Sequence, residues 1–448
     1  MVAQLSCQHI QRTLIYRFCH PAVLLLGCLS LVSLLHLQSI SAATSGIDFY
    51  QFWLGGKIAL SGNGEALYSV EGRTRLGFEG VIAAHQVNDP LRIAASEQRR
   101  VLETYSTPFL YSVFGGFSSD SYAVDLQRYR MGLLGCFVAA IVLFSRLLSL
   151  NAVTVLAALC FFLNRFEPLS SELRVGNVNS IQLFGLALYT SIRVCWKNRW
   201  KDACSGILLG LLLAFKPNLA LILPLVFFEI VCRRQHRALI SQIAGLVVGV
   251  LGAFAVSGFV FGGMQCWRSF YESLARMPDG IIRVDQGNIS PQMLLRASIG
   301  TDWGLTMIPL VVCISIVALW VRRRQKFPVV YSKSTVESRR QLSYLALGCL
   351  LVVLLPPLAW LHYFIMTVPA LLLVLPQANE EFVRLSWLRI AVCVLVWMTV
   401  AFNPLSFRTG GFTMTEFGMV TLSGVVLAFF VVFGGLFAKG HLPNEPQR

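Results

Sequence analysis

The chain has 448 residues, of which 56% are hydrophobic and only 13% are charged, and its formal net charge is +15. Apolar runs long enough to cross a bilayer recur along its length, which excludes a soluble globular protein and predicts an all-α polytopic membrane protein. The Lys and Arg residues stand in short clusters beside these runs, as cytoplasmic loops of membrane proteins do, so we expect no nucleic-acid partner.

The twelve cysteines indicate neither a disulfide framework nor a metal site. Most of them lie within apolar runs, and only Cys266 falls in a segment that we place outside the membrane. The sequence has no CxxC pair, no cluster of His and Cys residues, and no paired acidic motif that would demand a metal. We therefore expect no cofactor and no metal ligands, although a need for a divalent ion stays open.

The amino-terminal segment predicts a cytoplasmic N-terminus. Residues 1–20 carry Arg12 and Arg17 ahead of the first apolar run, which extends from Pro21 to about Leu37. The small residues from Ser39 to Ala43 would also fit a signal-peptidase site, so both retention and removal of this run stay open. In either case the chain that follows lies on the outer side of the membrane.

A large outer loop is predicted over residues 42–130, because its eight basic and nine acidic residues give no reason to hold it inside. Asp48 stands near its start, a few residues beyond the membrane boundary, and aromatic residues follow. Leu91 to Tyr105 has the pattern of an amphipathic surface helix, and Thr107-Pro108-Phe109 marks a return to the membrane. We expect this loop to form amphipathic helices.

The segment from Ala203 to Cys232 has cationic clusters on both sides, so both of its ends are predicted to be cytoplasmic. It is longer than one span of about 20 residues but too short for two full spans. We therefore predict a hairpin of two short helices that turns at Lys216-Pro217, since proline suits the first turn of the second helix. Lys216 would then lie at the floor of an outward-facing cavity.

The whole pattern predicts about twelve transmembrane helices in one domain over residues 21–438, with both termini cytoplasmic. The remaining predicted segments are a polar outer connection (164–179), a second outer loop (262–302), a cytoplasmic linker (325–340) and a cytoplasmic tail (439–448).

Charge asymmetry puts four polar features on the outer side of the membrane: Asp48, Lys216, His362 and the Gly176-Asn177 turn. Soluble nucleotide sugars and ATP are scarce outside a bacterial inner membrane, so chemistry at that face would draw on lipid-linked intermediates. This argues for a lipid-phosphate substrate and for the bilayer as a partner.

Spaced motifs in this chain resemble those of glycosyltransferase family 87. They are Asp48-Phe49 with Phe52-Trp53, Gly64 with Leu67-Tyr68, Lys216-Pro217, and Trp360-Leu361-His362-Tyr363, in a resemblance that covers about Ile47 to Leu375. The resemblance implies an integral-membrane enzyme of the GT-C fold, such as a polyprenyl-phosphate-mannose-dependent mannosyltransferase. Two departures leave the sugar and the acceptor open: Thr107-Pro108-Phe109 where the family often has Tyr-Pro-Pro, and Gly176-Asn177 where it often has Gly-Gln.

The resemblance also implies a reaction. A hexose such as mannose would move from a polyprenyl phosphate to a hydroxyl of a glycolipid or cell-envelope glycan, at the outer face of a bacterial inner (plasma) membrane. Asp48 would act as the general base in an inverting transfer, Lys216 would hold the donor phosphate, and His362 would bind that phosphate or share the acceptor proton. The substrate-binding candidates are Trp53, Tyr68, Asn177, Asn179, Trp360 and Tyr363.

Each candidate also has a purely structural explanation. Asp48 would fit a helix cap, Lys216 a side chain that extends to lipid headgroups, and His362 an interfacial aromatic belt. Asn177 and Asn179 are common turn formers, and the charged residues between Arg165 and Arg174 would form a solvated rim.

Other functions also stay open. A secondary transporter would share the twelve-helix plan, although transporters usually have short outer loops and binding residues near the midplane. A lipid-linked glycan polymerase or ligase would share the large outer loops. A structural membrane component would need none of these motifs.

Overall fold

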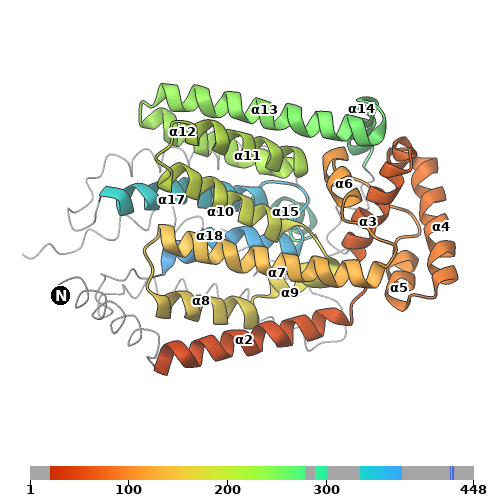
Figure 1. The fold of residues 1–448 in the computed structure, drawn as a ribbon, viewed down its shortest axis with the longest axis horizontal. Coiled ribbons are helices and arrows are strands. Elements are labelled where there is room, and N and C mark those ends of the chain that lie inside the picture. Colours follow the sequence, from red (N-terminus) through yellow and green to blue (C-terminus); the bar gives the residue numbers. More distant parts are fainter. Residues whose placement is uncertain (1–20, 278–287, 300–332, 376–423, 425, 428–448) are drawn as a thin grey trace, which may run out of the picture.

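The computed structural model describes residues 21–277, 288–299, 333–375, 424 and 426–427. Within these residues every regular element is a helix and there is no strand, which confirms the predicted all-α class (Figure 1). The predicted tails at 1–20 and 439–448 lie outside the described residues, as do part of the predicted second outer loop and half of the predicted linker.

Three helices in the described part of the chain are long and apolar enough to cross a membrane: α2 (Pro21–Ala42), α7 (Tyr122–Leu147) and α13 (His236–Phe261). A fourth span is counted if α8 (Ala152–Arg165) and α9 (Glu167–Val175), which meet at a bend of 53°, are taken as one. The structure thus supports a helical membrane protein, and the predicted number of about twelve spans stays a prediction.

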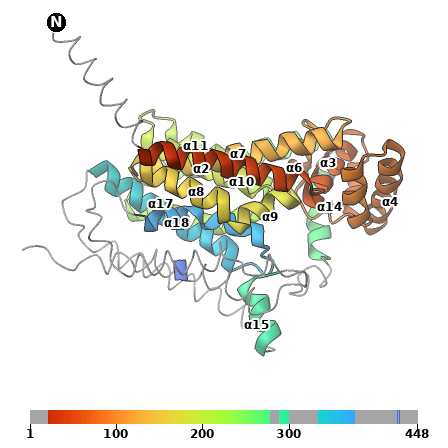
Figure 2. The same cartoon turned by 90° about the horizontal axis from the view of Figure 1, so that it is seen from below.

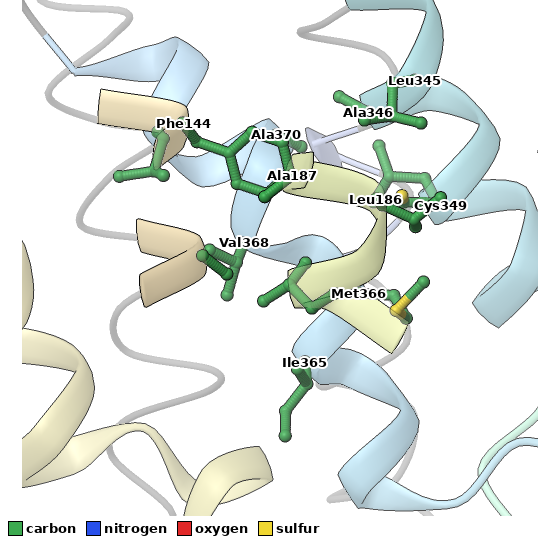
Figure 3. Packing of buried hydrophobic residues seen from close by; sticks show 14 of the residues in the cluster. Phe144, Leu186, Ala187, Leu345, Ala346, Cys349, Ile365, Met366, Val368 and Ala370 are labelled. Carbon is green, nitrogen blue, oxygen red and sulfur yellow. The ribbon is translucent and has the colours of Figure 1, made fainter. Parts of the chain in front are cut away.

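The apolar helices pack side by side into an elongated bundle (Figure 1). Besides α2, α7, α8 and α13 it contains α10 (Asn179–Cys195), α11 (Lys201–Phe215), α12 (Leu223–Cys232), α17 (Lys333–Leu354) and α18 (Val368–Val374). Its interior is a continuous cluster of buried apolar side chains, in which Phe144 of α7, Leu186 of α10 and Cys349 of α17 come together with Val368 of α18 (Figure 3). Burial of these side chains joins segments that are far apart in sequence.

The predicted hairpin is present. Helix α11 ends at Phe215, Lys216 has extended backbone angles (φ −150°, ψ 107°), and Pro217 opens a short 3₁₀ helix, η2 (Pro217–Ile222), that leads into α12. Proline is accommodated there because the first residues of a helix need no backbone N–H partner. Lys216 is therefore the tip of the hairpin.

Helices α11 and α13 run parallel and in close contact. A Cβ atom added to Gly206 would overlap the carbonyl oxygen of Gln242, and one added to Gly249 would overlap that of Ile207. Residue numbers rise together on the two helices at these contacts, so both helices begin at the same end of the bundle. Small residues on each helix permit this backbone approach, as in other membrane helix pairs.

The segment predicted to be the first outer loop folds into a helical subdomain, which we call the outer subdomain, at one end of the bundle (Figure 1 and Figure 2). It consists of α3 (Ile47–Leu60), η1 (Gly64–Tyr68), α4 (Val70–Val87), α5 (Pro90–Gln98) and α6 (Pro108–Gly115), and it is joined by α14 (Gln265–Ala275) from the second outer loop. Local signals set several boundaries: the side chains of Ser69, Asp89 and Thr107 each accept a backbone N–H at the start of a helix.

One predicted boundary in this loop was wrong: helix α5 ends at Gln98, well before the predicted end at Tyr105. Helix α7 begins at Tyr122, so the last residues of the predicted loop are helical. The subdomain also has its own core, with Tyr50, Trp53 and Tyr111 nearly or fully buried. Its aromatic residues thus pack against one another in the interior of the subdomain.

The end of the predicted second outer loop contacts the segment that precedes His362. Asn288 donates from its side chain to the carbonyl oxygen of Pro357 at 2.7 Å, and Ile289 donates from its backbone to that of Ala359 at 2.8 Å. Helix α15 (Pro291–Ile299) follows these contacts, and η5 (Leu361–Thr367) follows Trp360.

Candidate active site

Five polar side chains converge where the outer subdomain meets the bundle. Asp48 lies in the first turn of α3, Asn177 between α9 and α10, Asn179 at the start of α10, Lys216 at the hairpin tip, and His362 in η5. These segments are separated by up to about 300 positions in the sequence, and the order of helices in the bundle brings their ends together.

Asp48 is held by two donors. Asn177 donates from its side-chain amide to Oδ2 of Asp48 at 2.8 Å, and Arg99 donates to Oδ1 at 3.3 Å. The Asp48 side chain is 17% exposed, so it is accessible to solvent. The N-cap of α3 is Gly46 and no side chain caps it, so Asp48 does not serve as a helix cap.

Lys216 is bound by amide oxygens. Its Nζ donates to Oδ1 of Asn177 and to Oδ1 of Asn179, both at 3.0 Å, and it lies 4.3 Å from the ring centroid of Tyr363. Desolvation by the surrounding protein lowers the pKa of Lys216 to about 8, while the charges of Glu172 and Asp48 act in the opposite direction. The ammonium is therefore turned into the site and does not extend to lipid headgroups.

His362 is a buried and neutral imidazole. Its side chain is 7% exposed, and burial lowers its pKa to about 4, an effect that Asp48 opposes and Lys216 reinforces. Its Nε2 lies 3.9 Å from Oδ2 of Asp48, which is beyond hydrogen-bond distance, and has no hydrogen-bond partner. This nitrogen is thus available to a ligand that enters beside Asp48.

The Gly176-Asn177 turn fixes the amide that joins Asp48 and Lys216. Gly176 has φ +75°, and a Cβ atom there would lie 2.6 Å from Cβ of Phe49, so only glycine fits. The carbonyl oxygen of Asn177 accepts from the hydroxyl of Tyr129 at 2.6 Å, and its side-chain oxygen also accepts from the backbone of Val178 at 2.8 Å. The amide orientation is therefore set by several bonds.

Glu172 is a further buried carboxylate that the sequence did not single out. It is 0% exposed and accepts hydrogen bonds from the backbone N–H and the hydroxyl of Ser180, at 2.8 and 2.9 Å. The prediction that the charged residues here form a solvated rim was wrong for Glu172, although Arg174 and Glu167 do form a partly exposed ion pair at 2.8 Å. Glu172 joins the ends of α9 and α10 beneath the site.

The other predicted binding residues divide into two groups. Asn179 and Tyr363 contact Lys216 directly, and Trp360 is partly exposed just before η5. Trp53 instead donates to Oδ2 of Asp125 at 3.0 Å, and Tyr68 donates to the carbonyl oxygen of Ser106 at 3.0 Å, both deep in the outer subdomain. The structure therefore places Trp53 and Tyr68 in that core and not at the site.

Arg99 and Tyr129 contact the site, although neither belongs to a motif selected from the sequence. Arg99 follows α5, and Tyr129 stacks on Phe49 with ring centroids 4.8 Å apart. Over the described residues, no group of three or more His, Cys, Asp and Glu side chains is arranged to hold a metal ion.

Comparison with known proteins gives one family. The family model described as glycosyltransferase family 87 matches residues 113–336, which is half of the chain. The matched range includes Asn177, Asn179 and Lys216, whereas Asp48 and His362 lie outside it. No curated protein and no solved structure matches the chain.

Proposed function

Because this chain belongs to glycosyltransferase family 87, we propose that the site around Asp48 and Lys216 transfers a hexose from a polyprenyl phosphate to a hydroxyl acceptor. Family membership together with the apolar helices makes the protein a membrane glycosyltransferase. The finer proposal is carried by one observation: a carboxylate and an ammonium are bonded to the two ends of the same Asn177 amide.

A phosphate-bearing donor fits the cationic side of the site. An ammonium has three donors, and Lys216 uses two of them on Asn177 and Asn179, so one stays available for a ligand oxygen. Arg99 brings a second positive charge to the opposite oxygen of Asp48. Cations placed at a leaving phosphate stabilise the charge that develops there as the bond breaks.

The proposed step is a single displacement with inversion. The acceptor oxygen attacks the anomeric carbon, the bond from that carbon to the phosphate oxygen breaks, and the electron pair leaves with the polyprenyl phosphate. The acceptor proton passes to Asp48 as the general base. Positioned proton transfer of this kind typically contributes about 10²- to 10⁴-fold.

His362 would act as a neutral donor or acceptor to the sugar or the phosphate. Its Nε2 faces Asp48 across a gap of 3.9 Å and is otherwise unpaired. A ligand group between the two side chains would satisfy this nitrogen, which is unfavourable to leave buried without a partner.

The location of the site supports a lipid-borne donor at the extracytoplasmic face. Site residues lie at one end of the bundle, and the basic ends of α10 and α12 with Arg193, Arg233 and Arg234 lie at the other. The positive-inside rule assigns those basic ends to the cytoplasm. A polyprenyl tail can then stay in the hydrocarbon while its phosphate reaches Lys216. We extend this to a bacterial inner membrane, a mannose donor and a glycolipid or cell-envelope glycan acceptor.

The proposal is tested by transfer in isolated membranes. Membranes with wild-type protein or Asp48→Asn are given a panel of polyprenyl-phosphate sugars and a glycolipid extract, and product is quantified. We expect Asp48→Asn to lose at least about 10²-fold of transfer at equal membrane levels. Asp120→Asn is the matched control, because Asp120 is fully exposed and, among the described residues, its ion pair is with Lys57 at 3.0 Å. Equal activity of wild type and Asp48→Asn would refute the mechanism.

A further inference from the structure

A cavity of about 610 Å³ lies at the far end of the bundle from the candidate active site. Helix α10 begins at the active site with Asn179 and reaches this cavity at Arg193, and α11 begins at the cavity with Lys201 and reaches the active site before Lys216. At about 1.5 Å per residue, the two sites are about 20 Å apart along these helices. The cavity is therefore separate from the sugar-transfer site.

The cavity wall is strongly basic. It contains five Lys and Arg side chains, one histidine and two carboxylates, and the five cations are Arg193, Lys201, Arg233, Arg234 and Arg237. Such a cluster in a partly enclosed space produces a positive field that attracts anions.

Only some of these cations are neutralised by protein carboxylates. Arg193 pairs with the buried Glu229 at 3.3 Å, and Arg233 pairs with Glu337 at 2.6 Å. Lys201, Arg234 and Arg237 have no ion pair among the described residues. The two paired arginines are thus neutralised within the protein, and the other three cations leave positive charge available to a ligand.

Two helix N-termini also open into the cavity. Helices α11 and α13 are parallel, and the first residues of both, including Lys201 and His236, line it. Neither helix has a side-chain cap, at Trp200 or at Gln235. The first backbone N–H groups of a helix lack intrahelical partners, and the helix dipole favours negative charge there.

Gln341 adds an unpaired group in the same wall. It is 6% exposed and donates from its side chain to Glu337 at 3.3 Å, while its Oε1 has no hydrogen-bond partner. Buried acceptors are normally satisfied, so this oxygen indicates a missing donor. A hydroxyl group on a bound ligand would supply it.

We propose that this cavity binds a phosphate ester that also carries a hydroxyl group, of the glycerol-phosphate type. The unpaired cations and the two helix N-termini would bind the phosphate, and Gln341 would accept from the hydroxyl. The volume is that of a small-molecule site. The same chemistry occurs in a soluble phosphate ester and in an anionic phospholipid headgroup, and basic pockets between helices on the cytoplasmic side are known to take such headgroups. The proposal is independent of the sugar donor.

The test uses the purified full-length protein with two probes. Glycerol 3-phosphate is titrated by calorimetry, and phosphatidylglycerol is compared with phosphatidylcholine by native mass spectrometry. The double variant Lys201→Gln with Arg237→Gln should bind the recognised probe at least about tenfold more weakly. The control Lys197→Gln with Arg199→Gln removes two exposed charges from the preceding loop, outside the cavity wall, and should change affinity less than about twofold.

The outcomes distinguish a soluble phosphate ester from a phospholipid headgroup. If the wild-type protein binds glycerol 3-phosphate and the cavity variant does not, the ligand is soluble. If the wild-type protein binds phosphatidylglycerol in preference to phosphatidylcholine, the ligand is a headgroup. Gln341→Leu should weaken the binding of glycerol 3-phosphate but leave the binding of inorganic phosphate unchanged. An equal effect on both affinities would overturn the hydroxyl contact. Failure of wild type to bind either probe, or equal losses in the cavity and control variants, would overturn the site.

Discussion

Asn177 donates a hydrogen bond from its side-chain amide to Oδ2 of Asp48, over 2.8 Å. The oxygen of the same amide accepts from Lys216 at 3.0 Å. One planar group therefore sets the position of the proposed base relative to the proposed phosphate-binding cation. Gly176, with φ +75°, keeps the backbone before this amide in a conformation that other residues rarely adopt.

The first prediction concerns this amide. Asn177→Leu keeps the approximate size of the side chain but removes both bonds, so Asp48 and Lys216 lose their common support. We expect transfer to fall by about 10- to 100-fold, because misplacement of reacting groups by about 1 Å has effects of this size. Asn177→Gln, which keeps the amide, should retain more activity than the leucine variant. The in vitro transfer assay measures both, with thermal unfolding as the check on folding, and full activity of Asn177→Leu would contradict the role.

The second prediction concerns pH. The pKa of Lys216 is lowered to about 8, so its ammonium is the main form below that pH and is lost above it. Since the charged form would bind the donor phosphate, kcat/KM for the donor should decline as the pH rises through about 8. Lys216→Arg should have lower activity but no decline near that pH, because a guanidinium stays protonated. An alkaline decline that persists unchanged in Lys216→Arg would assign it to another group.

His362 should not contribute to this profile. Its pKa is lowered to about 4, so it stays neutral across the range in which Lys216 titrates. The profile of the free enzyme between about pH 5 and 9 is therefore expected to lack a limb from histidine.

Much of the arrangement of the site could be predicted from the positions of basic clusters and apolar segments along the sequence. Basic clusters on both sides of one short apolar segment predicted the hairpin, and its tip at Lys216 does lie at the same end of the bundle as Asp48 and His362. This could be predicted because the positive-inside rule acts on each loop separately and needs no tertiary contacts. The roles of these residues stay predictions.

The contacts that depend on tertiary packing could not be predicted. Arg99 contacts Asp48 from just beyond the end of α5 at Gln98, whereas the periodicity of that segment allowed a helix up to Tyr105. Trp53 and Tyr68 stand among residues typical of a membrane interface, yet they pack in the core of the outer subdomain. A pattern of aromatic residues does not distinguish an interface from a core.

The third prediction concerns Glu172, which joins the ends of α9 and α10 beneath the site. Glu172→Ala would leave the backbone N–H and hydroxyl of Ser180 without their acceptors in a buried position. We expect unfolding to become easier by about 1–3 kcal/mol. Glu167→Ala on the same helix is the control, because its ion pair with the partly exposed Arg174 contributes at most about 1 kcal/mol. Thermal unfolding in detergent compares the two, and equal shifts would show that Glu172 has no special structural role.

The fourth prediction uses two glycines of α13. A methyl group at Gly249 would overlap the backbone of Ile207, whereas one at Gly252 meets nothing within 4 Å. Gly249→Ala should therefore force α13 and α11 apart and destabilise the protein by about 1–3 kcal/mol. Gly252→Ala should be neutral or stabilising by up to about 1 kcal/mol, since alanine favours a helix.

The separation of α11 from α13 in Gly249→Ala should also move the active-site residue Lys216, because α11 ends directly before it. Gly249→Ala is thus expected to raise KM for the donor at temperatures where the variant is still folded, while Gly252→Ala should leave it unchanged. Thermal unfolding and the transfer assay together give this result. If the two alanine variants have the same unfolding midpoint and the same KM, the close contact of α11 and α13 does not position the hairpin tip.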